Sequence, residues 1–380
     1  MQAHREFLGS PALLALGALL IVAGCPEPPG DDDDTTGAFD DDDDSGDDDD
    51  SAGGLDDWEP LRAAIDASEL EDVTVLIGTA DGVAFVHEKG TSQSDTVYAL
   101  ASASKWLSSV TALRLAEEGT LTLEDNPQDH LSWWTADAAD PRSAITVEQL
   151  LSFTSGFGGD IDGVPCVEDG DSTLEACAQE IHDTLHTYEP GSTFHYGPAH
   201  LQVVAAMASA ATSRRWHRLF RQQIGDPLGM APTTGFALPS LDNPRAAGGG
   251  TGSAQDYASF LIALSSGQLL SAASLEVMAA DHTGDGVTLA GLPATAMDGR
   301  SWHYGLGCWR ECAGETHTAD CEKPGVLSSP GAFGFYPWWD QGRGLWGVVA
   351  TQLIGVGGGA EITVPLGQEW AELAAVALGR

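Results

Sequence analysis

The stretch YALASASKWLSSV, residues 98–110, places a serine, Ser102, three residues before a lysine, Lys105, at the start of an apolar run. On a helix these two side chains lie on one face, so the hydroxyl and the amine can meet. A serine hydroxyl is a weak nucleophile near neutral pH, and burial lowers the pKa of a lysine enough for it to act as the base. The spacing marks Ser102 as a candidate nucleophile and Lys105 as its activator, although the same pattern also occurs where a serine only caps a helix.

The residues after Lys105 predict a buried helix from Ser102 to Glu118, with Gly119 closing it. Its apolar side chains recur at roughly helical spacing, at Trp106, Leu107, Val110, Leu113 and Leu115. Upstream, residues 61–65 fit an amphipathic helix. The β-rich runs VTVLI (73–77) and VAFV (83–86) are separated by a segment containing an Asp-Gly pair, which predicts a hairpin.

The β pattern returns only near the C-terminus, where LWGVVAT (345–351) predicts a central strand and residues 368–378 predict a closing helix. The middle of the chain is mostly helical and rich in loops, with capping-box patterns at residues 146–149 and 253–256. We therefore predict an α/β protein of the α+β kind. An antiparallel sheet formed by both chain ends is flanked by helices, and a mostly helical region is inserted.

Several segments, in order along the chain, resemble the serine β-lactamase and DD-peptidase superfamily, most closely its class C β-lactamase and esterase branch. They are residues 98–125 around Ser102, ITVEQLLSFTSGF (145–157), DPLGM (226–230), and AGGG (247–250) with Asp256. The resemblance covers residue 55 to the C-terminus. It implies a β-lactamase/transpeptidase-like fold and hydrolysis through a Ser102 acyl-enzyme, with no metal and no cofactor.

The second motif of that superfamily is Tyr-x-Asn, in which the tyrosine acts as a base or proton shuttle. HYGP (195–198) resembles it, so the shuttle role falls to Tyr196, provided that Lys105 holds the tyrosine pKa down. The asparagine position holds Pro198, which offers neither an amide side chain nor a backbone donor. His195 and His200 are interpreted as structural, although His200 could orient Tyr196.

The third motif normally reads Lys or His, a small residue, then Gly, and Ser329-Pro-Gly331 resembles it without the cationic group. That departure favours an esterase or a D-amino-acid peptidase over a β-lactamase. Ser329 could still donate a hydrogen bond, and the backbone N–H groups of Ser102 and Ala332 could form an oxyanion hole. The alternative is that Gly331 only permits close packing of the strand.

The N-terminus predicts export. Residues 1–24 contain a short apolar stretch and fit a signal peptide, and VAGC (22–25) resembles the bacterial lipobox, which implies a lipid on Cys25. An ordinary secretory cleavage is the alternative. Residues 25–54 include thirteen aspartates and predict an extended, disordered tether that lacks the loop spacing of a calcium site. We expect a lipid-anchored protein of the bacterial cell envelope, periplasmic or on the outer surface, with residues 55–380 as a β-lactamase-related serine hydrolase domain.

The remaining cysteines predict disulfides, because export permits them. Cys166 and Cys177 flank an acidic loop and make a local pair, and Cys312–Cys321 is the preferred second pair, which leaves Cys308 over. A zinc site formed by the last three cysteines with His303 and His317 is the competing interpretation, but paired CxxC spacing is lacking. Trp302, Trp309, Trp338 and Trp339 cluster near the third motif and are expected in the core, while any exposed member would line an apolar acyl pocket.

The charge excludes one class of partner. The chain has 57 Asp and Glu against 16 Lys and Arg, a net charge of −41, which is incompatible with a basic nucleic-acid surface. The leading hypothesis is hydrolysis of a small ester, amide or D-amino-acid peptide. A catalytically weak envelope-binding protein that retains the fold is the alternative. A structural lipoprotein acting through its aspartate tract would leave Ser102 dispensable.

Overall fold

The computed structural model describes residues 57–159, 163–293, 300–312, 317–318, 321, 325–354 and 358–380. The predicted signal peptide, Cys25 and the tether at residues 25–54 lie outside these ranges. Within the described ranges, no helix is both long enough and apolar enough to cross a membrane.

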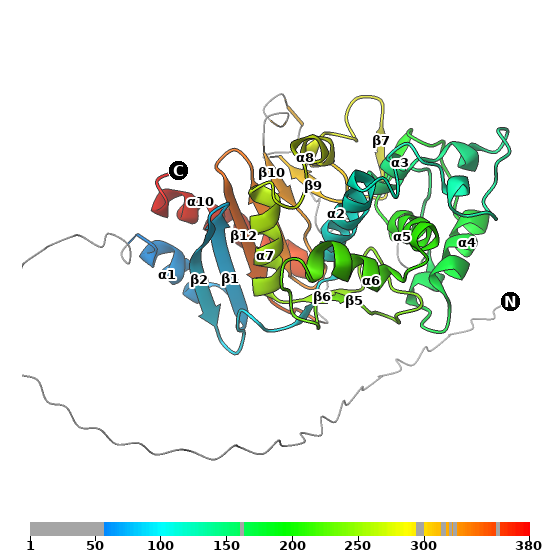
Figure 1. Cartoon of the computed structure of the whole chain (residues 1–380). Coiled ribbons are helices and arrows are strands. Elements are labelled where there is room, and N and C mark those ends of the chain that lie inside the picture. Colours follow the sequence, from blue (N-terminus) through cyan, green and yellow to red (C-terminus); the bar gives the residue numbers. More distant parts are fainter. Residues whose placement is uncertain are drawn as a thin grey trace, which may run out of the picture. The chain divides into compact units, whose positions relative to one another are not determined.

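Both ends of the folded chain contribute to one seven-stranded antiparallel sheet, in the order β2-β1-β12-β11-β10-β9-β8 (Figure 1). Its strands are β1 (Val73–Thr79), β2 (Gly82–Lys89), β8 (His303–Tyr304), β9 (Trp309–Glu311), β10 (Val326–Ser328), β11 (Tyr336–Asp340) and β12 (Leu345–Ala350). The pairing of Val75 with Val349 shows how N-terminal and C-terminal strands share the ladder. This arrangement confirms the predicted α+β fold.

Helices cover the sheet on both sides (Figure 1). The helices are α1 (Glu59–Ala67), α2 (Ser104–Glu117), α3 (Val147–Leu151), α4 (Leu174–Thr184), α5 (Ala199–Thr212), α6 (Trp216–Phe220), α7 (Ala254–Ser265), α8 (Ala272–Ala279) and α10 (Gly359–Ala377). α10 packs on β11 and β12 beside α1, and α7 packs on β1 and β12. α2 to α6 form the inserted helical region, in which α5 contacts α2, α3, α4 and α6.

Shorter elements connect these layers. β3 (Tyr98–Ala99), β6 (Gly250–Gly252) and β5 (Gly235–Phe236) form a small antiparallel sheet, and β4 (Thr193–His195) pairs in parallel with β7 (Thr288–Ala290). Single helical turns are η1 (Ala101–Ala103), η2 (Pro127–Asp129), η3 (Pro141–Ala144), η4 (Pro165–Glu168) and η5 (Arg221–Gly225). Because β3 pairs with β6, the segment before Ser102 lies beside the glycine-rich residues 247–250.

The local predictions agree with the structure except at the last helix. Thr146 and Ser253 accept the backbone N–H three residues ahead, as capping residues do. The closing helix begins at Gly359, nine residues before its predicted start, and includes Pro365. Proline in a helix interior removes a backbone donor, which is why the sequence pattern placed the start after it.

The cysteines pair as preferred. Cys166–Cys177 and Cys312–Cys321 are disulfides, each with Cα atoms 5.3 Å apart, and Cys308 is a buried free thiol. The first disulfide connects η4 with α4, and the second joins two residues within the segment between β9 and β10. Cys308 lies in an apolar environment that raises the pKa of its thiol to about 12, so it stays protonated at neutral pH.

Candidate active site

The nucleophile candidate lies on a tight turn that joins β3 to α2. Ser102 belongs to η1, and Lys105 lies in the first turn of α2. Ala101, directly before the serine, has a positive φ of 44°, a conformation that non-glycine residues adopt at an energetic cost. Two hydrogen bonds hold this turn in place. Leu100 N–H donates to the Gly250 oxygen on β6, and the Tyr257 hydroxyl on α7 donates to the Ala103 oxygen. The strained turn holds Ser102 at the wall of a cavity.

Lys105 is placed to exchange a proton with Ser102. Its Nζ lies 3.0 Å from Ser102 Oγ and donates to the Ala247 carbonyl oxygen at 2.9 Å. Burial lowers the pKa of Lys105 to about 7, and the nearby Arg245 guanidinium adds to that effect. A large fraction of this amine is therefore neutral near pH 7 and has a lone pair to accept the serine proton.

Tyr196 completes the convergence on Ser102. Lys105 Nζ lies over its ring, 4.5 Å from the centroid, and its hydroxyl forms hydrogen bonds with the Ser102 and Trp309 side chains. Burial raises the pKa of Tyr196 well above its usual value and outweighs those hydrogen bonds. Tyr196 is thus a neutral phenol rather than a tyrosine whose pKa Lys105 holds down, because desolvation dominates at this position.

The histidines flanking Tyr196 have different surroundings. His200 is buried and neutral, since burial lowers its pKa to about 3. Its Nε2 donates to the His195 carbonyl oxygen and its Nδ1 accepts from the Ser155 hydroxyl, each at 2.8 Å. These bonds join the residue 145–157 segment to α5 and support the loop that carries Tyr196. Pro198 is the first residue before α5 and lines the cavity, as does His195.

The third-motif residues approach the serine from the loop between β10 and β11. The Ser329 hydroxyl is buried and donates to the Ser102 carbonyl oxygen at 2.8 Å, so it braces the nucleophile turn. Gly331 donates its N–H to the Phe335 oxygen, and an added Cβ would lie 2.3 Å from the Leu100 oxygen. The contact with Leu100 therefore requires glycine. Ala332 lines the cavity beside Ser102, whereas Ser329 and Gly331 do not line it.

A cavity of about 810 Å³ opens onto Ser102, Lys105 and Tyr196. Much of its wall is apolar, with side chains from Leu292, Pro293 and Phe333. Arg245 supplies a positive charge to the wall and is paired with Glu168.

The four tryptophans near the third motif are buried, as expected, so none is an exposed wall of the cavity. Trp309 nevertheless contacts a site residue, because its ring stacks on that of Tyr196 with centroids 5.2 Å apart. Neither the role of Arg245 nor that of Trp309 was predicted. Arg245 precedes the glycine-rich segment, but its proximity to Lys105 depends on the fold.

Two groups among the described residues could hold a metal ion: Cys312, His317 and Cys321, and Asp281, His303 and His317. Neither includes a residue that lines the cavity at Ser102. The chemistry of Ser102, Lys105 and Tyr196 does not require a metal, since the amine supplies the base.

We compared the chain with known protein families and with curated proteins. Residues 66–360 match the family model described as Beta-lactamase. Protein flp of Staphylococcus aureus is 27% identical over 161 residues, which are 42% of this chain and 32% of that protein. The match thus spans about a third of the length of that curated relative.

Solved structures agree on the fold. A candidate beta-lactamase from Bacteroides dorei superposes with a TM-score of 0.71 at 24% identity, covering 83% of this chain and 98% of that one. EstCE1, described as a hydrolase with promiscuous acyltransferase activity, superposes with a TM-score of 0.64 at 21% identity, covering 81% of this chain and 96% of that one. At these identities the likeness shows the fold alone.

Proposed function

Because this chain belongs to the beta-lactamase family, we propose that it is a serine hydrolase that cleaves a small ester or amide through an acyl-enzyme on Ser102. The observation that carries the proposal is the 3.0 Å approach of Lys105 Nζ to Ser102 Oγ, with a lysine pKa of about 7. A buried amine beside a serine at the end of a cavity is the arrangement that nucleophilic catalysis needs.

In the proposed reaction, Ser102 Oγ attacks the substrate carbonyl carbon and its proton passes to neutral Lys105. The resulting oxyanion accepts hydrogen bonds from the N–H groups of Ser102 and Ala332. Tyr196, neutral and hydrogen-bonded to Ser102, relays the proton from Lys105 to the leaving group. Water, deprotonated by the same pair, then attacks the acyl carbonyl carbon. The bond to Ser102 Oγ breaks, the oxygen takes that proton back, and the acid is released.

The cavity favours an ester with an apolar acyl group. Leu292, Pro293 and Phe333 offer apolar contact area next to Ser102. EstCE1, of the same fold, is a hydrolase with acyltransferase activity, which is compatible with such a substrate. Pro198 and Ser329 lack the amide and cationic groups that the resemblance associates with β-lactams, so β-lactam hydrolysis is the weaker expectation.

A second candidate is cleavage of D-amino-acid peptides, and Arg245 favours it. A peptide of that kind ends in a carboxylate, and Arg245 is a cation in the cavity wall that could receive it. Its present partner, Glu168, is half exposed and could be displaced. For such a substrate Arg245→Gln should raise KM, while for neutral esters KM should stay unchanged.

We further propose that the protein is exported and held in the bacterial cell envelope by a lipid on Cys25. The apolar stretch followed by VAGC at residues 22–25 supports this proposal. The catalytically weak envelope-binding protein remains the alternative, and it predicts that ligands bind without acylating Ser102.

The test is intact-mass analysis after exposure to a fluorophosphonate, to a penicillin and to p-nitrophenyl acetate. We expect a fluorophosphonate adduct on Ser102 and turnover of the ester, both absent from Ser102→Ala. Ser104→Ala is the matched control: Ser104 lies two residues from Ser102 but does not line the cavity, so its loss should leave the adduct in place. If the folded protein forms no adduct with any probe, the hydrolase proposal is contradicted and the catalytically weak envelope-binding protein is favoured.

A further inference from the structure

Two histidines and an aspartate meet at the β8 edge of the seven-stranded sheet, outside the cavity already described. Asp281 follows α8, His303 lies on β8, and His317 lies between β9 and β10. One oxygen or nitrogen atom of each residue lies within 4.8 Å of the others. Asp281 Oδ2 is 2.5 Å from His303 Nδ1 and 3.8 Å from His317 Nε2.

The carboxylate is held so that one oxygen faces the histidines. Thr283 donates its backbone N–H to Asp281 Oδ1 at 2.8 Å and its hydroxyl to the same oxygen at 3.2 Å. Oδ2 is therefore left for the imidazoles. Carboxylates that bind metal ions are commonly fixed in this way by hydrogen bonds from outside the ligand set.

His317 contacts both the Asp281 carboxylate and the ring of His303. The rings of His303 and His317 stack in parallel, with centroids 3.4 Å apart and planes at 3°. A nitrogen of each ring lies within 3.8 Å of the same Asp281 oxygen, so three possible ligand atoms converge on one point. Two imidazole nitrogens and one carboxylate oxygen are the donor types of a three-ligand zinc site.

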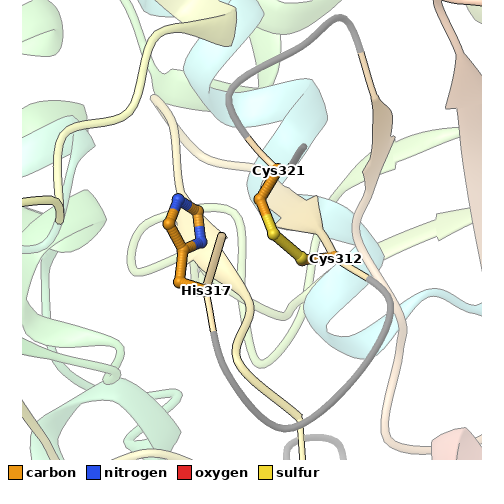
Figure 2. A group of neighbouring side chains, drawn as sticks. All are labelled: Cys312, His317 and Cys321. Atoms are coloured by element: carbon orange, nitrogen blue, oxygen red, sulfur yellow. A yellow bond between two sulfur atoms is a disulfide. The ribbon is translucent and has the colours of Figure 1, made fainter. Parts of the chain in front are cut away.

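The neighbouring cysteines support the position of His317 rather than compete for the ion. Figure 2 shows the His317 imidazole beside the Cys312–Cys321 disulfide. Disulfide sulfurs are poor ligands, because metal ions bind the thiolate. Cys321 Sγ instead accepts the Thr318 N–H at 3.2 Å, which fixes the chain next to His317.

One group opposes cation binding. Arg310 lies close enough to influence Asp281, although its guanidinium donates to the backbone oxygens of Ala279 and Cys321. We therefore expect weaker binding than at closed four-ligand zinc sites.

We propose that Asp281, His303 and His317 bind one divalent ion of the zinc class, with a fourth position open to water. The ion would join the end of α8 to β8 and to the segment between β9 and β10. Tyr304, next to His303 on β8, packs edge-on against Tyr196 with centroids 6.2 Å apart. The site would thus stabilise the wall behind Tyr196 without taking part in the reaction.

The test uses the full chain without an affinity tag, freed of metal with a chelator and kept without reductant. We expect Zn²⁺ to raise the unfolding temperature, with a shift that grows as the logarithm of its concentration above Kd, and Co²⁺ to give the absorption of a low-coordinate site. The unfolding temperature reports on the folded domain, so weak binding of Zn²⁺ to the aspartates of the tether does not confuse it.

His303→Gln and His317→Gln should each reduce the affinity at least tenfold while leaving the metal-free unfolding temperature near that of the wild type. His130→Gln is the matched control, since His130 Nε2 bonds Asp125 at 2.8 Å and, within the described part of the chain, its ring does not stack on a second imidazole. The proposal fails if Zn²⁺ does not shift the wild type or shifts these variants equally. It also fails if binding needs reductant and is lost in Cys312→Ser, which would assign the ion to the cysteines.

Discussion

The pKa of Lys105 sets the pH at which Ser102 can be activated. Burial lowers that pKa to about 7, and the neutral amine is the form that accepts the serine proton. We therefore expect kcat/KM for a neutral ester to rise with pH, with a midpoint near 7, and to level off above about pH 8. Rates measured from pH 5 to 9 check this directly.

Arg245→Gln provides a variant that should move the midpoint in a known direction. It removes a positive charge that disfavours protonation of Lys105, so the pKa should rise and the profile should shift to higher pH. Lys105→Ala should lower kcat/KM by about 10²-fold or more at every pH. An unshifted profile in Arg245→Gln, or a rate independent of pH in the wild type, would contradict the assignment of Lys105 as the base.

For individual site residues, the sequence predicted a contact correctly where the spacing between two residues is enough to bring them together. Ser102 and Lys105 are three residues apart, so their contact follows from one helical turn. The electrostatics of Tyr196 could not be foreseen, because its desolvation comes from residues distant in sequence, such as Trp309. The bond from Ser329 to the Ser102 carbonyl likewise depends on residues 227 positions apart.

Among the elements, the loop between β10 and β11 must approach η1 closely for the site to form. A Cβ on Gly331 would lie 2.3 Å from the Leu100 oxygen, and that atom belongs to a fixed turn. Gly331→Ala should push Ala332 away from Ser102. We expect kcat/KM to fall about 10²-fold, because displacements near 1 Å have effects of that size.

Gly119→Ala separates this effect from a general loss of stability. Gly119 has a φ of 72° after α2, and an added Cβ would meet no atom within 4 Å. This control should lower the free energy of unfolding by about 1 kcal/mol, from the strained φ, with kcat/KM unchanged. Equal activity in Gly331→Ala and the wild type would show that the close approach does not position the site.

Elements with local signals were predictable from the sequence. The hairpin of β1 and β2 and the caps at Thr146 and Ser253 depend on residues a few positions apart. β8 and β9 were not predicted, because strands of two and three residues carry too little periodicity. The small sheet of β3, β5 and β6, which supports the Ser102 turn, was missed for the same reason.

For the whole molecule, the decisive contact is between the two ends of the folded chain. β1 lies between β2 and β12, and Thr74 pairs with Ala350. The sheet is therefore completed only by strands that are distant in sequence. This arrangement was predictable because β patterns occur only near both ends, whereas the positions of α8 and of the segment carrying His317 against β8 were not.

The same topology predicts which parts of the chain are dispensable. A chain that starts at Asp57 keeps α1 and every strand of the sheet, so it should fold and hydrolyse a soluble ester at the full rate. It should be recovered in the soluble fraction of cells, as should full-length Cys25→Ser, while the wild type should be in the membrane fraction. A chain that ends before β12 would leave β1 and β11 without their shared partner and should not fold. Recovery of the wild type in the soluble fraction would refute the lipid anchor, and loss of activity on starting at Asp57 would give the N-terminal residues a role in the fold.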